Sequence, residues 1–315
     1  MKVVLTGASS FSGYWFAKTL AANGHEVVMP LRAASVESYS GMRGIRVQRL
    51  LTLGRVVTGM EFGSEMFLAW LRKESAPDLF CHHASSVSDH KAMDFDCGRA
   101  LAANVRGFPE IAALLSRGGC RGIVVTGTYY EPDEGDGSTP LEGFSPYALS
   151  KSLSFAVARY YGQRNGLAVG KFVMPNPFGP LENKGFTYSM IQRWISGQAF
   201  SVQAPEYVRD NIHVDLLALA YEAFCRRVFC GKERFARTSP SGYVENQGLF
   251  AQRFQSAVGL RTSLACGLEI CRQTEFNEPL NRHNLEPAAA QFPQWSESAA
   301  WDGIAVNACK GEPCR

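Results

Sequence analysis

The sequence predicts an α/β fold, a doubly wound parallel sheet of the Rossmann type followed by a smaller C-terminal lobe. A glycine turn joins an apolar strand to a helix at the very start of the chain. Apolar strands then alternate with helical segments up to about residue 176, and beyond this point the alternation weakens. We therefore expect one domain at 1–176 and a lobe at 177–315 that is interleaved with it.

The first elements form a strand, a turn, a helix and a second strand, at residues 2–5, 6–13, 14–22 and 26–29. Gly7 permits a sharp turn, and Gly13 permits the helix to approach the strand. The N–H groups at the helix start suit a pyrophosphate. The turn, whose other members are Ser9, Ser10, Phe11 and Ser12, therefore predicts a dinucleotide site, with Ser10 in place of the usual middle glycine.

The residues after the second strand bear on the choice of dinucleotide. An acid at this point bonds the ribose hydroxyls of NAD, whereas an arginine accommodates the 2′-phosphate of NADP. This chain has Pro30-Leu31-Arg32 and no acid. Arg32 could equally be a solvated loop charge, but the pattern favours NADP over NAD.

The later elements place polar residues at the ends of strands. Segment 77–85 is a buried strand ending in His82 and Ala84, and 121–128 is a strand carrying Thr126 and Thr128. Segment 98–117 is helix-like, a helix begins near Pro146 and runs to about Gln163, and 171–174 is a further strand. Ligands of such sheets gather at the carboxyl ends of the strands, so Thr128, Tyr147 and Asn176 should lie near one edge.

Tyr147 and Lys151 are the pair of residues that most directly indicates chemistry. Four residues apart on a helix, they lie on one face. A neighbouring ammonium favours the phenolate, which would let the tyrosine exchange a proton near neutral pH. The spacing alone is equally compatible with an exposed lysine near a half-buried tyrosine.

Bulk properties argue against several classes of function. The net charge is +3, only 19% of residues are charged, and no basic cluster is interleaved with aromatics, so we expect no nucleic-acid partner. The apolar runs are too short to span a bilayer, and the chain begins directly with a strand, which predicts a cytoplasmic protein with no membrane partner. The nine cysteines do not form Cys-x-x-Cys motifs with histidines, so we expect reduced thiols and no metal site.

Taken in order, these motifs resemble the extended short-chain dehydrogenase/reductase family, specifically its sugar-nucleotide epimerase/dehydratase group. The resemblance covers residues 1–215 well and the last third loosely. Besides the nucleotide loop and the Tyr-x-x-x-Lys pair, it rests on four segments: Asn104-Val-Arg-Gly107, Thr126-Gly-Thr128, Pro175-Asn-Pro-Phe-Gly-Pro180 and Arg209-Asp-Asn-Ile-His-Val-Asp215.

The resemblance implies roles for these residues and a nucleotide-diphosphate sugar as substrate. Catalytic roles fall on Thr128, Tyr147, Lys151 and Asn104, with Thr126 as the fallback for Thr128. Substrate contacts fall on Thr128, Asn176 and Arg209, unless Arg209 is an ion-pair partner of Asp210 or Asp215. The cofactor contacts are Gly7, Ser9, Ser10, Phe11, Ser12, Gly13, Arg32, His82, Ala84, Thr126, Tyr147, Lys151 and Pro175. The resemblance also implies a homodimer formed through helices 98–117 and 147–163.

Several functions stay open within this resemblance. A sugar-nucleotide epimerase re-reduces the carbon that it oxidises and keeps its cofactor, whereas a keto-sugar-nucleotide reductase consumes NADPH. A 4,6-dehydratase usually has Asp-Glu after its threonine, but here Tyr129-Tyr130 follow Thr128 and Glu131 comes one place too late. The usual Asp after the third strand has no counterpart in 47–52. A non-catalytic NADP-binding sensor is the last alternative. We favour the epimerase.

Overall fold

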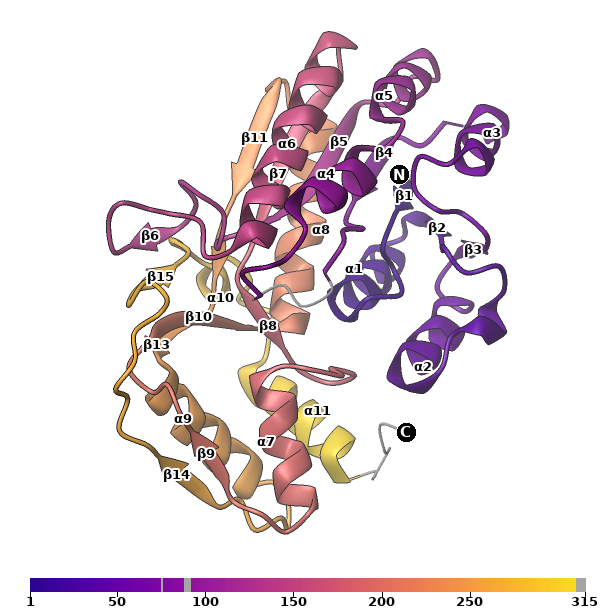
Figure 1. Ribbon diagram of the computed structural model, residues 1–315. Coiled ribbons are helices and arrows are strands. Elements are labelled where there is room, and N and C mark those ends of the chain that lie inside the picture. The colour runs from indigo at the N-terminus through magenta and orange to yellow at the C-terminus, as the bar shows by residue number, and fades with distance from the viewer. Residues whose placement is uncertain (75, 88–91, 310–315) are drawn as a thin grey trace.

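The computed structural model describes residues 1–74, 76–87 and 92–309, and its centre is a seven-stranded sheet with the order β11-β7-β5-β4-β1-β2-β3 (Figure 1). All neighbours in it are parallel. The strands are β1 (Lys2–Leu5), β2 (Glu26–Pro30), β3 (Arg55–Val57), β4 (Leu79–His82), β5 (Gly122–Thr128), β7 (Ala168–Met174) and β11 (Phe235–Thr238). The order reverses between β1 and β4, where ligands bind in open parallel sheets. The predicted fold class is confirmed.

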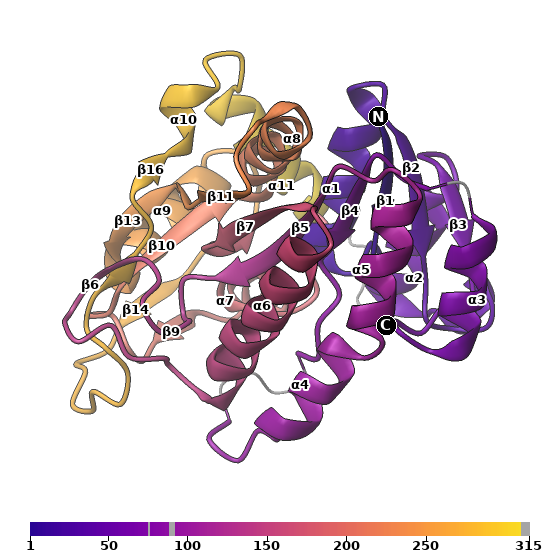
Figure 2. The same cartoon turned by 90° about the horizontal axis from the view of Figure 1, so that it is seen from above.

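Helices cover both faces of this sheet (Figure 2). One layer contains α1 (Phe11–Ala22), α2 (Gly41–Leu50) and α8 (Val214–Cys230), and the other contains α3 (Glu65–Lys73), α4 (Cys97–Val105), α5 (Phe108–Arg117) and α6 (Pro146–Arg164). Val3 and Leu5 of β1 pack into the first layer and Val4 packs into the second, because successive side chains of a strand point to opposite faces. Burial on both faces explains why these strands are continuously apolar.

A smaller lobe lies beside the carboxyl ends of the main strands (Figure 1). Its sheet has the order β13-β10-β8, formed by Tyr243–Asn246, Val208–His213 and Asn176–Phe178. It also contains α7 (Phe186–Ile195), α9 (Gln247–Gly259), α11 (Glu297–Cys309) and the paired strands β9 (Phe200–Val202) and β14 (Leu268–Ile270). Phe178, Trp194 and Trp301 belong to its separate apolar core.

The remaining elements of the described chain are short. They are η1 (Val36–Ser38), β6 (Asp136–Gly137), β12 (Pro240–Ser241), β15 (Arg282–His283), β16 (Glu286–Pro287) and α10 (Ala288–Gln291). β6 pairs with β15, so the last third of the chain contacts the loop that follows β5. The boundary at residue 176 stays a prediction. The elements α8 and β11 follow this residue in sequence but pack in the main domain.

Two expectations about local structure were wrong. The helix-like segment 98–117 is two helices, α4 and α5, because the backbone leaves the helical region at Arg106 and enters the left-handed region at Gly107 (φ 64°). Segment 47–52 is not the end of a third strand. Most of it belongs to α2, where Val47 and Leu50 turn toward the core, and the third strand is β3.

Three further features bear on the sequence expectations. Within 1–74, 76–87 and 92–309, no helix is long and apolar enough to cross a membrane. The same residues contain no group of three or more His, Cys, Asp or Glu side chains placed to hold a metal ion. Every cysteine in the described part of the chain is a free thiol, and Cys314 lies outside it.

Candidate active site

In the loop between β1 and α1, backbone segments lie very close to one another. Gly7 has φ 75°, and a Cβ at this position would lie 2.8 Å from the backbone nitrogen of Ala84. A Cβ at Gly13 would lie 2.2 Å from the carbonyl oxygen of Gly7. Any side chain at either position would displace backbone, so both predicted glycines are required by the turn itself.

The start of α1 can hold a phosphate group. Ser10 is the N-cap, and its Oγ accepts a hydrogen bond from the Gly13 backbone nitrogen (3.1 Å). The next two amides, of Phe11 and Ser12, find no acceptor among the described residues. These two amides are donors at the positive end of a helix, and the adjoining turn has glycine at positions 7 and 13. The arrangement fits the pyrophosphate of a dinucleotide.

His83 was not predicted as a site residue, but it ties the loop to β5. Its Nε2 lies 3.1 Å from Ser10 Oγ and 3.0 Å from Ser12 Oγ, and its Nδ1 lies 3.0 Å from Thr126 Oγ1. Burial, with smaller effects of Lys151 and His82, lowers its pKa to about 3, so the imidazole is neutral at physiological pH. The only sequence signal was its position at the end of a buried strand.

His82 and Asn104 join the end of β4 to α4 and α6. The Nδ1 of His82 lies 3.3 Å from Thr6 Oγ1, and its Nε2 lies 2.9 Å from the carbonyl oxygen of Asn104. Thr6 Oγ1 also accepts from the Ala84 backbone nitrogen (3.0 Å). The Asn104 side chain accepts from the Ser86 nitrogen (3.0 Å) and donates to Ser154 Oγ (3.2 Å). These contacts fix the strand ends against the helices.

Two arginines of α2 reach the nucleotide loop, and neither was predicted. Arg43 donates to Ser9 Oγ from Nε (3.1 Å) and Nη2 (2.7 Å), and the residue is exposed to solvent. Arg46 is buried and donates to the carbonyl oxygen of Ser9 (3.1 Å). Arg32, the predicted cofactor residue, is exposed at the end of β2. The loop thus has cationic groups on the side toward β2.

Tyr147 and Lys151 lie in the first turns of α6, whose position beside β5 brings Lys151 to the predicted Thr126. The Lys151 Nζ donates to the carbonyl oxygen of Thr126. Burial, followed by the charge of Lys171, lowers the pKa of Lys151 to about 8, although Glu131 acts in the opposite direction.

The pKa of the Tyr147 phenol is raised, which is opposite to the direction expected from Lys151 alone. Burial is the main cause, and the Glu131 carboxylate and Tyr130 add to it. The phenol is therefore in its proton-donating form. Its ring lies edge-on to Phe95, with 5.8 Å between ring centroids.

Thr128 ends β5, Asn176 begins β8 just after the end of the neighbouring strand β7, and Tyr130 joins the two residues. The Thr128 Oγ1 accepts a long bond from the Tyr130 backbone nitrogen (3.4 Å), and the Tyr130 hydroxyl donates to Asn176 Oδ1 (2.8 Å). Pro175 is buried between β7 and β8. The structure therefore brings the two threonines, the Tyr-Lys pair and Asn176 to the carboxyl edge of the sheet, as the sequence predicts.

Arg209 forms an ion pair with a residue that the sequence analysis did not consider. Its guanidinium pairs with Glu278 (2.9 Å) and donates to the Val208 carbonyl oxygen (2.8 Å), so its carboxylate partner is neither Asp210 nor Asp215. The guanidinium carbon also lies 5.0 Å from the centre of the Phe144 ring. Phe144 precedes the helix that carries Tyr147, so Arg209 lies against the approach to α6.

Arg282 was not predicted as a site residue, but it donates hydrogen bonds to several backbone carbonyl oxygens near the site. It is completely buried, and it donates to the carbonyl oxygens of Tyr129 (3.1 Å), Glu131 (3.2 Å), Glu134 (3.1 Å) and Glu142 (2.8 Å). One side chain from the last third of the chain thus ties together the loop between Thr128 and Tyr147. Nothing in the local sequence signals this contact.

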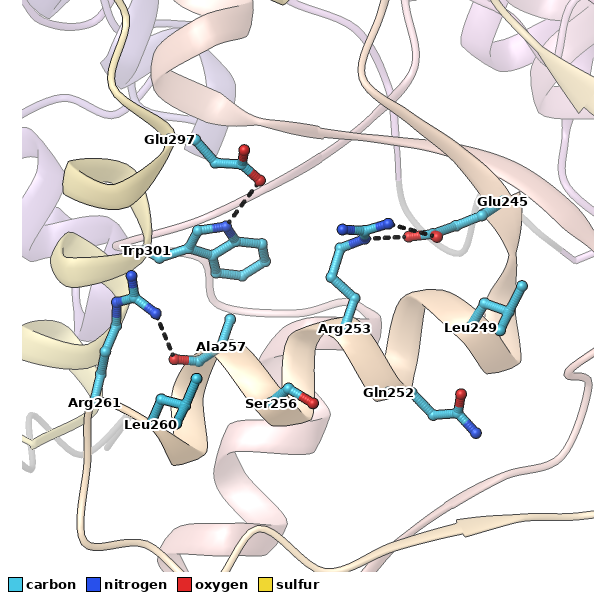
Figure 3. Close-up of a pocket in the computed structure, with 10 residues that line it drawn as sticks. All are labelled: Glu245, Leu249, Gln252, Arg253, Ser256, Ala257, Leu260, Arg261, Glu297 and Trp301. Atoms are coloured by element: carbon cyan, nitrogen blue, oxygen red, sulfur yellow. Dashed lines mark hydrogen bonds and ion pairs between the residues drawn. The ribbon is translucent and has the colours of Figure 1, made fainter.

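A separate groove of about 520 Å³ lies over α9 and α11 in the lobe (Figure 3). Its arginines already have partners: Arg253 is bonded to Glu245 (2.7 and 3.0 Å), and Arg261 donates to the Ala257 carbonyl oxygen (3.1 Å). None of the predicted site residues lines this groove. It is not part of the candidate active site.

Solved structures of similar fold include two epimerases and a dehydratase. UDP-glucose 4-epimerase from Thermotoga maritima, solved with UDP-glucose, has a TM-score of 0.73 at 14% identity, covering 99% of this chain and 100% of that one. The Thermus thermophilus UDP-glucose 4-epimerase, in complex with NAD, gives 0.71 at 18%, covering 98% and 99%. DesIV, a dTDP-glucose 4,6-dehydratase from Streptomyces venezuelae, gives 0.72 at 18%, covering 99% and 97%. At these identities the likeness establishes a shared fold.

The sequence itself places the chain in a family. It has no significant match among curated proteins. The model of the NAD dependent epimerase/dehydratase family, however, matches residues 3–233, which includes the nucleotide loop, both threonines and the Tyr-Lys pair. This chain belongs to the NAD dependent epimerase/dehydratase family, a group within the extended short-chain dehydrogenase/reductases.

Proposed function

We propose that this protein is an NAD(P)-dependent sugar-nucleotide epimerase that acts by reversible hydride transfer at a sugar carbon. The observation that carries the proposal is the position of Tyr147 and Lys151 at the carboxyl edge of the sheet, beside a loop that fits a dinucleotide. Structures of similar fold include UDP-sugar 4-epimerases, which supports a nucleotide sugar as the substrate.

Tyr147 is the general acid and base of the proposed reaction. Its phenol gives a proton to a sugar carbonyl oxygen, and the phenolate takes one from the corresponding hydroxyl. Lys151, with a pKa near 8, supplies a positive charge one helical turn away that favours the phenolate once formed. The nicotinamide, when bound, supplies a carrier for the hydride. Gly7, Ser9, Ser10, Phe11, Ser12 and Gly13 would hold its dinucleotide.

Thr128 orients the reacting oxygen through its hydroxyl. Among the described residues this hydroxyl makes one long hydrogen bond, as an acceptor, whereas the alternative, Thr126 Oγ1, is bonded to His83. Asn104 orders the α4 backbone and the chain after β4, which is the supporting role allowed by its contacts with Ser86 and Ser154. Asn176 and Arg209 would bind the diphosphate, for which Arg209 would have to exchange Glu278 for phosphate oxygens.

The main alternative is an NADPH-dependent keto-sugar-nucleotide reductase. The two reactions differ in the fate of the cofactor, since an epimerase regenerates it within each turnover and a reductase consumes it. The test is to dialyse the purified protein, measure bound cofactor, and follow the absorbance of reduced nicotinamide during turnover. We expect retained cofactor and no net absorbance change, and a stoichiometric loss of reduced cofactor would establish the reductase instead.

Two further alternatives have less support. In a 4,6-dehydratase Glu131 would have to exchange protons with the substrate, but both of its carboxylate oxygens already accept hydrogen bonds from Thr128 and Lys171. A non-catalytic NADP-binding sensor would have no need for both Tyr147 and Lys151 at the sheet edge. The contacts of the site therefore support the epimerase.

Arg32, which is exposed just after β2, and Arg43, which donates to Ser9 Oγ in the nucleotide loop, favour NADP as the cofactor. We expect Arg43→Ala to weaken NADP binding about tenfold or more, as the loss of a charged hydrogen bond predicts. NAD affinity should change by less than about twofold. Fluorescence titration of both cofactors measures this, with Arg49→Ala on the same helix as control. Equal losses for the two cofactors would contradict a 2′-phosphate contact.

We also propose that the protein is a homodimer. The face of α6 carries the exposed side chains of Leu149, Leu153 and Tyr160, which recur at helical spacing. Such an apolar stripe is suited to pairing with its copy in a second chain. Light scattering should give a particle of twice the chain mass, and a monomer at micromolar concentration would contradict the proposal.

A further inference from the structure

A buried charged cluster lies behind the proposed catalytic residues and has no part in the mechanism above. The Glu131 carboxylate is completely buried, and its Oε2 accepts from Lys171 Nζ (2.6 Å). Lys171 also pairs with Glu134 (2.7 Å), which pairs in turn with Arg237 (2.6 Å). Each charge is matched, as buried charges must be.

The cluster is directly connected to Thr128. The other oxygen of Glu131, Oε1, accepts a hydrogen bond from the Thr128 backbone nitrogen (2.8 Å). The strand leaves space for this carboxylate, because a Cβ on Gly127 would lie 2.7 Å from Oε1 and 2.9 Å from Lys171 Cε. Glu131 therefore fixes the backbone of the residue proposed to orient the reacting oxygen.

The same cluster faces α6. Lys171 Nζ lies over the ring of Phe155, 4.6 Å from its centre, and Phe155 is one helical turn beyond Lys151. In the sheet Lys171 is in register with Val125, next to the residue whose carbonyl oxygen accepts from Lys151. One carboxylate thus contacts the end of β5 and acts electrostatically on Tyr147 and Lys151.

We propose that Glu131 is a positioning residue that holds Thr128 in place and sets the charge balance of the Tyr147–Lys151 pair. The proposal rests on the epimerase function for its catalytic consequence, but its electrostatic part concerns the protein alone. Among the described residues, the charged and titratable groups around the pair and the cluster include Tyr130, Glu131 and Glu134 from the loop, Lys171 from β7, Arg237 from β11, Arg282 from β15, and His82 and His83 from the end of β4.

The test compares Glu131→Gln with Glu134→Gln. Each substitution removes one carboxylate from the same lysine with little change in size. Of these two glutamates, Glu131 is the one that bonds the Thr128 backbone nitrogen and acts electrostatically on Lys151. NMR of lysine labelled at Cε follows the titration of Lys151, whose signal is identified with Lys151→Met. We expect Glu131→Gln to lower the Lys151 midpoint by about one pH unit, because a neighbouring negative charge is lost. Glu134→Gln should leave it in place.

Equal shifts in the two variants, or no shift in Glu131→Gln, would overturn the proposal. If Glu131→Gln does not fold, the double variant Glu131→Gln with Lys171→Met leaves no unpaired lysine in the cluster. It should titrate below the matched double variant Glu134→Gln with Lys171→Met, which lacks the same lysine but keeps Glu131, and equal midpoints in these two variants would again overturn the proposal. The midpoint requires no substrate, so its shift can be observed even if the wild-type protein fails to epimerise any sugar nucleotide.

The dependence of turnover on pH tests the catalytic part of the proposal. With Glu131→Gln, the limb at which Tyr147 must lose its proton should move to lower pH, because one of the causes that raise the pKa of the phenol is removed. The Glu134→Gln profile should keep the wild-type limb. A limb that stays in place in Glu131→Gln would overturn the catalytic part.

Discussion

Replacing Tyr147 by phenylalanine is expected to lower turnover by roughly 10²- to 10⁴-fold, the usual contribution of a positioned general acid or base. The substitution removes one hydroxyl and keeps the ring that lies against Phe95. The nucleotide loop does not depend on this hydroxyl, so cofactor affinity should stay nearly unchanged. The measurements are kcat with the active sugar nucleotide and a fluorescence titration of cofactor.

The matched control for this prediction is Tyr160→Phe. Tyr160 belongs to the same helix, but 55% of its side chain is exposed at the far end from the sheet edge. This substitution removes only the hydroxyl and keeps the ring on the face proposed to form the dimer, so turnover should stay within about twofold of wild type. Unchanged activity in Tyr147→Phe would remove the acid/base assignment, whereas a loss of folding would be visible in both cofactor binding and circular dichroism.

Arg282→Met is expected to cost about 3–5 kcal/mol in the free energy of unfolding, because a hydrogen bond to a charged group contributes about 1.5–3 kcal/mol and several are lost together. Four carbonyl oxygens of the loop between Thr128 and Tyr147 would lose their donor. The ring of Phe144, which lies 5.0 Å from both Arg209 and Arg282, would lose one of its two cationic contacts. Denaturant unfolding measures the change.

Arg272→Met provides the comparison, because Arg272 is exposed and its replacement should change stability by less than about 0.5 kcal/mol. Arg282→Lys should be intermediate, since a lysine has three donors on one atom and cannot span the four carbonyls. Equal stability of Arg282→Met and Arg272→Met would mean that the loop is held by its own contacts and not by Arg282.

The candidate site residues whose positions in the fold follow from the sequence are those encoded by local spacing. Gly7 and Gly13 are separated by the one turn that joins a strand to a helix, and Tyr147 and Lys151 by one helical turn. Thr128 and Asn176 could be assigned to one edge because parallel strands bring their carboxyl ends together. Such features need no knowledge of how distant segments pack.

The residues that were missed depend on contacts between segments far apart in the chain. Arg282 reaches carbonyl groups about 140–153 residues earlier, and Lys171 reaches Glu131 across two neighbouring strands. Arg43 contacts Ser9 only because 41–50 forms a helix, α2, whose side chains reach the loop. Arg209 lies in β10, and its partner Glu278 comes from the last third of the chain, which the family resemblance covers only loosely.

The central claim is that hydrogen leaves and returns to one sugar carbon as a hydride. It is tested most directly by incubating the enzyme in heavy water with UDP-, GDP-, CDP- and dTDP-sugars and either cofactor, and analysing the products by NMR. The account predicts a stereoisomer of one sugar nucleotide whose inverted carbon keeps its protium, since a hydride held on the cofactor does not exchange with solvent. Deuterium at the inverted carbon would show proton abstraction instead, and would contradict the account.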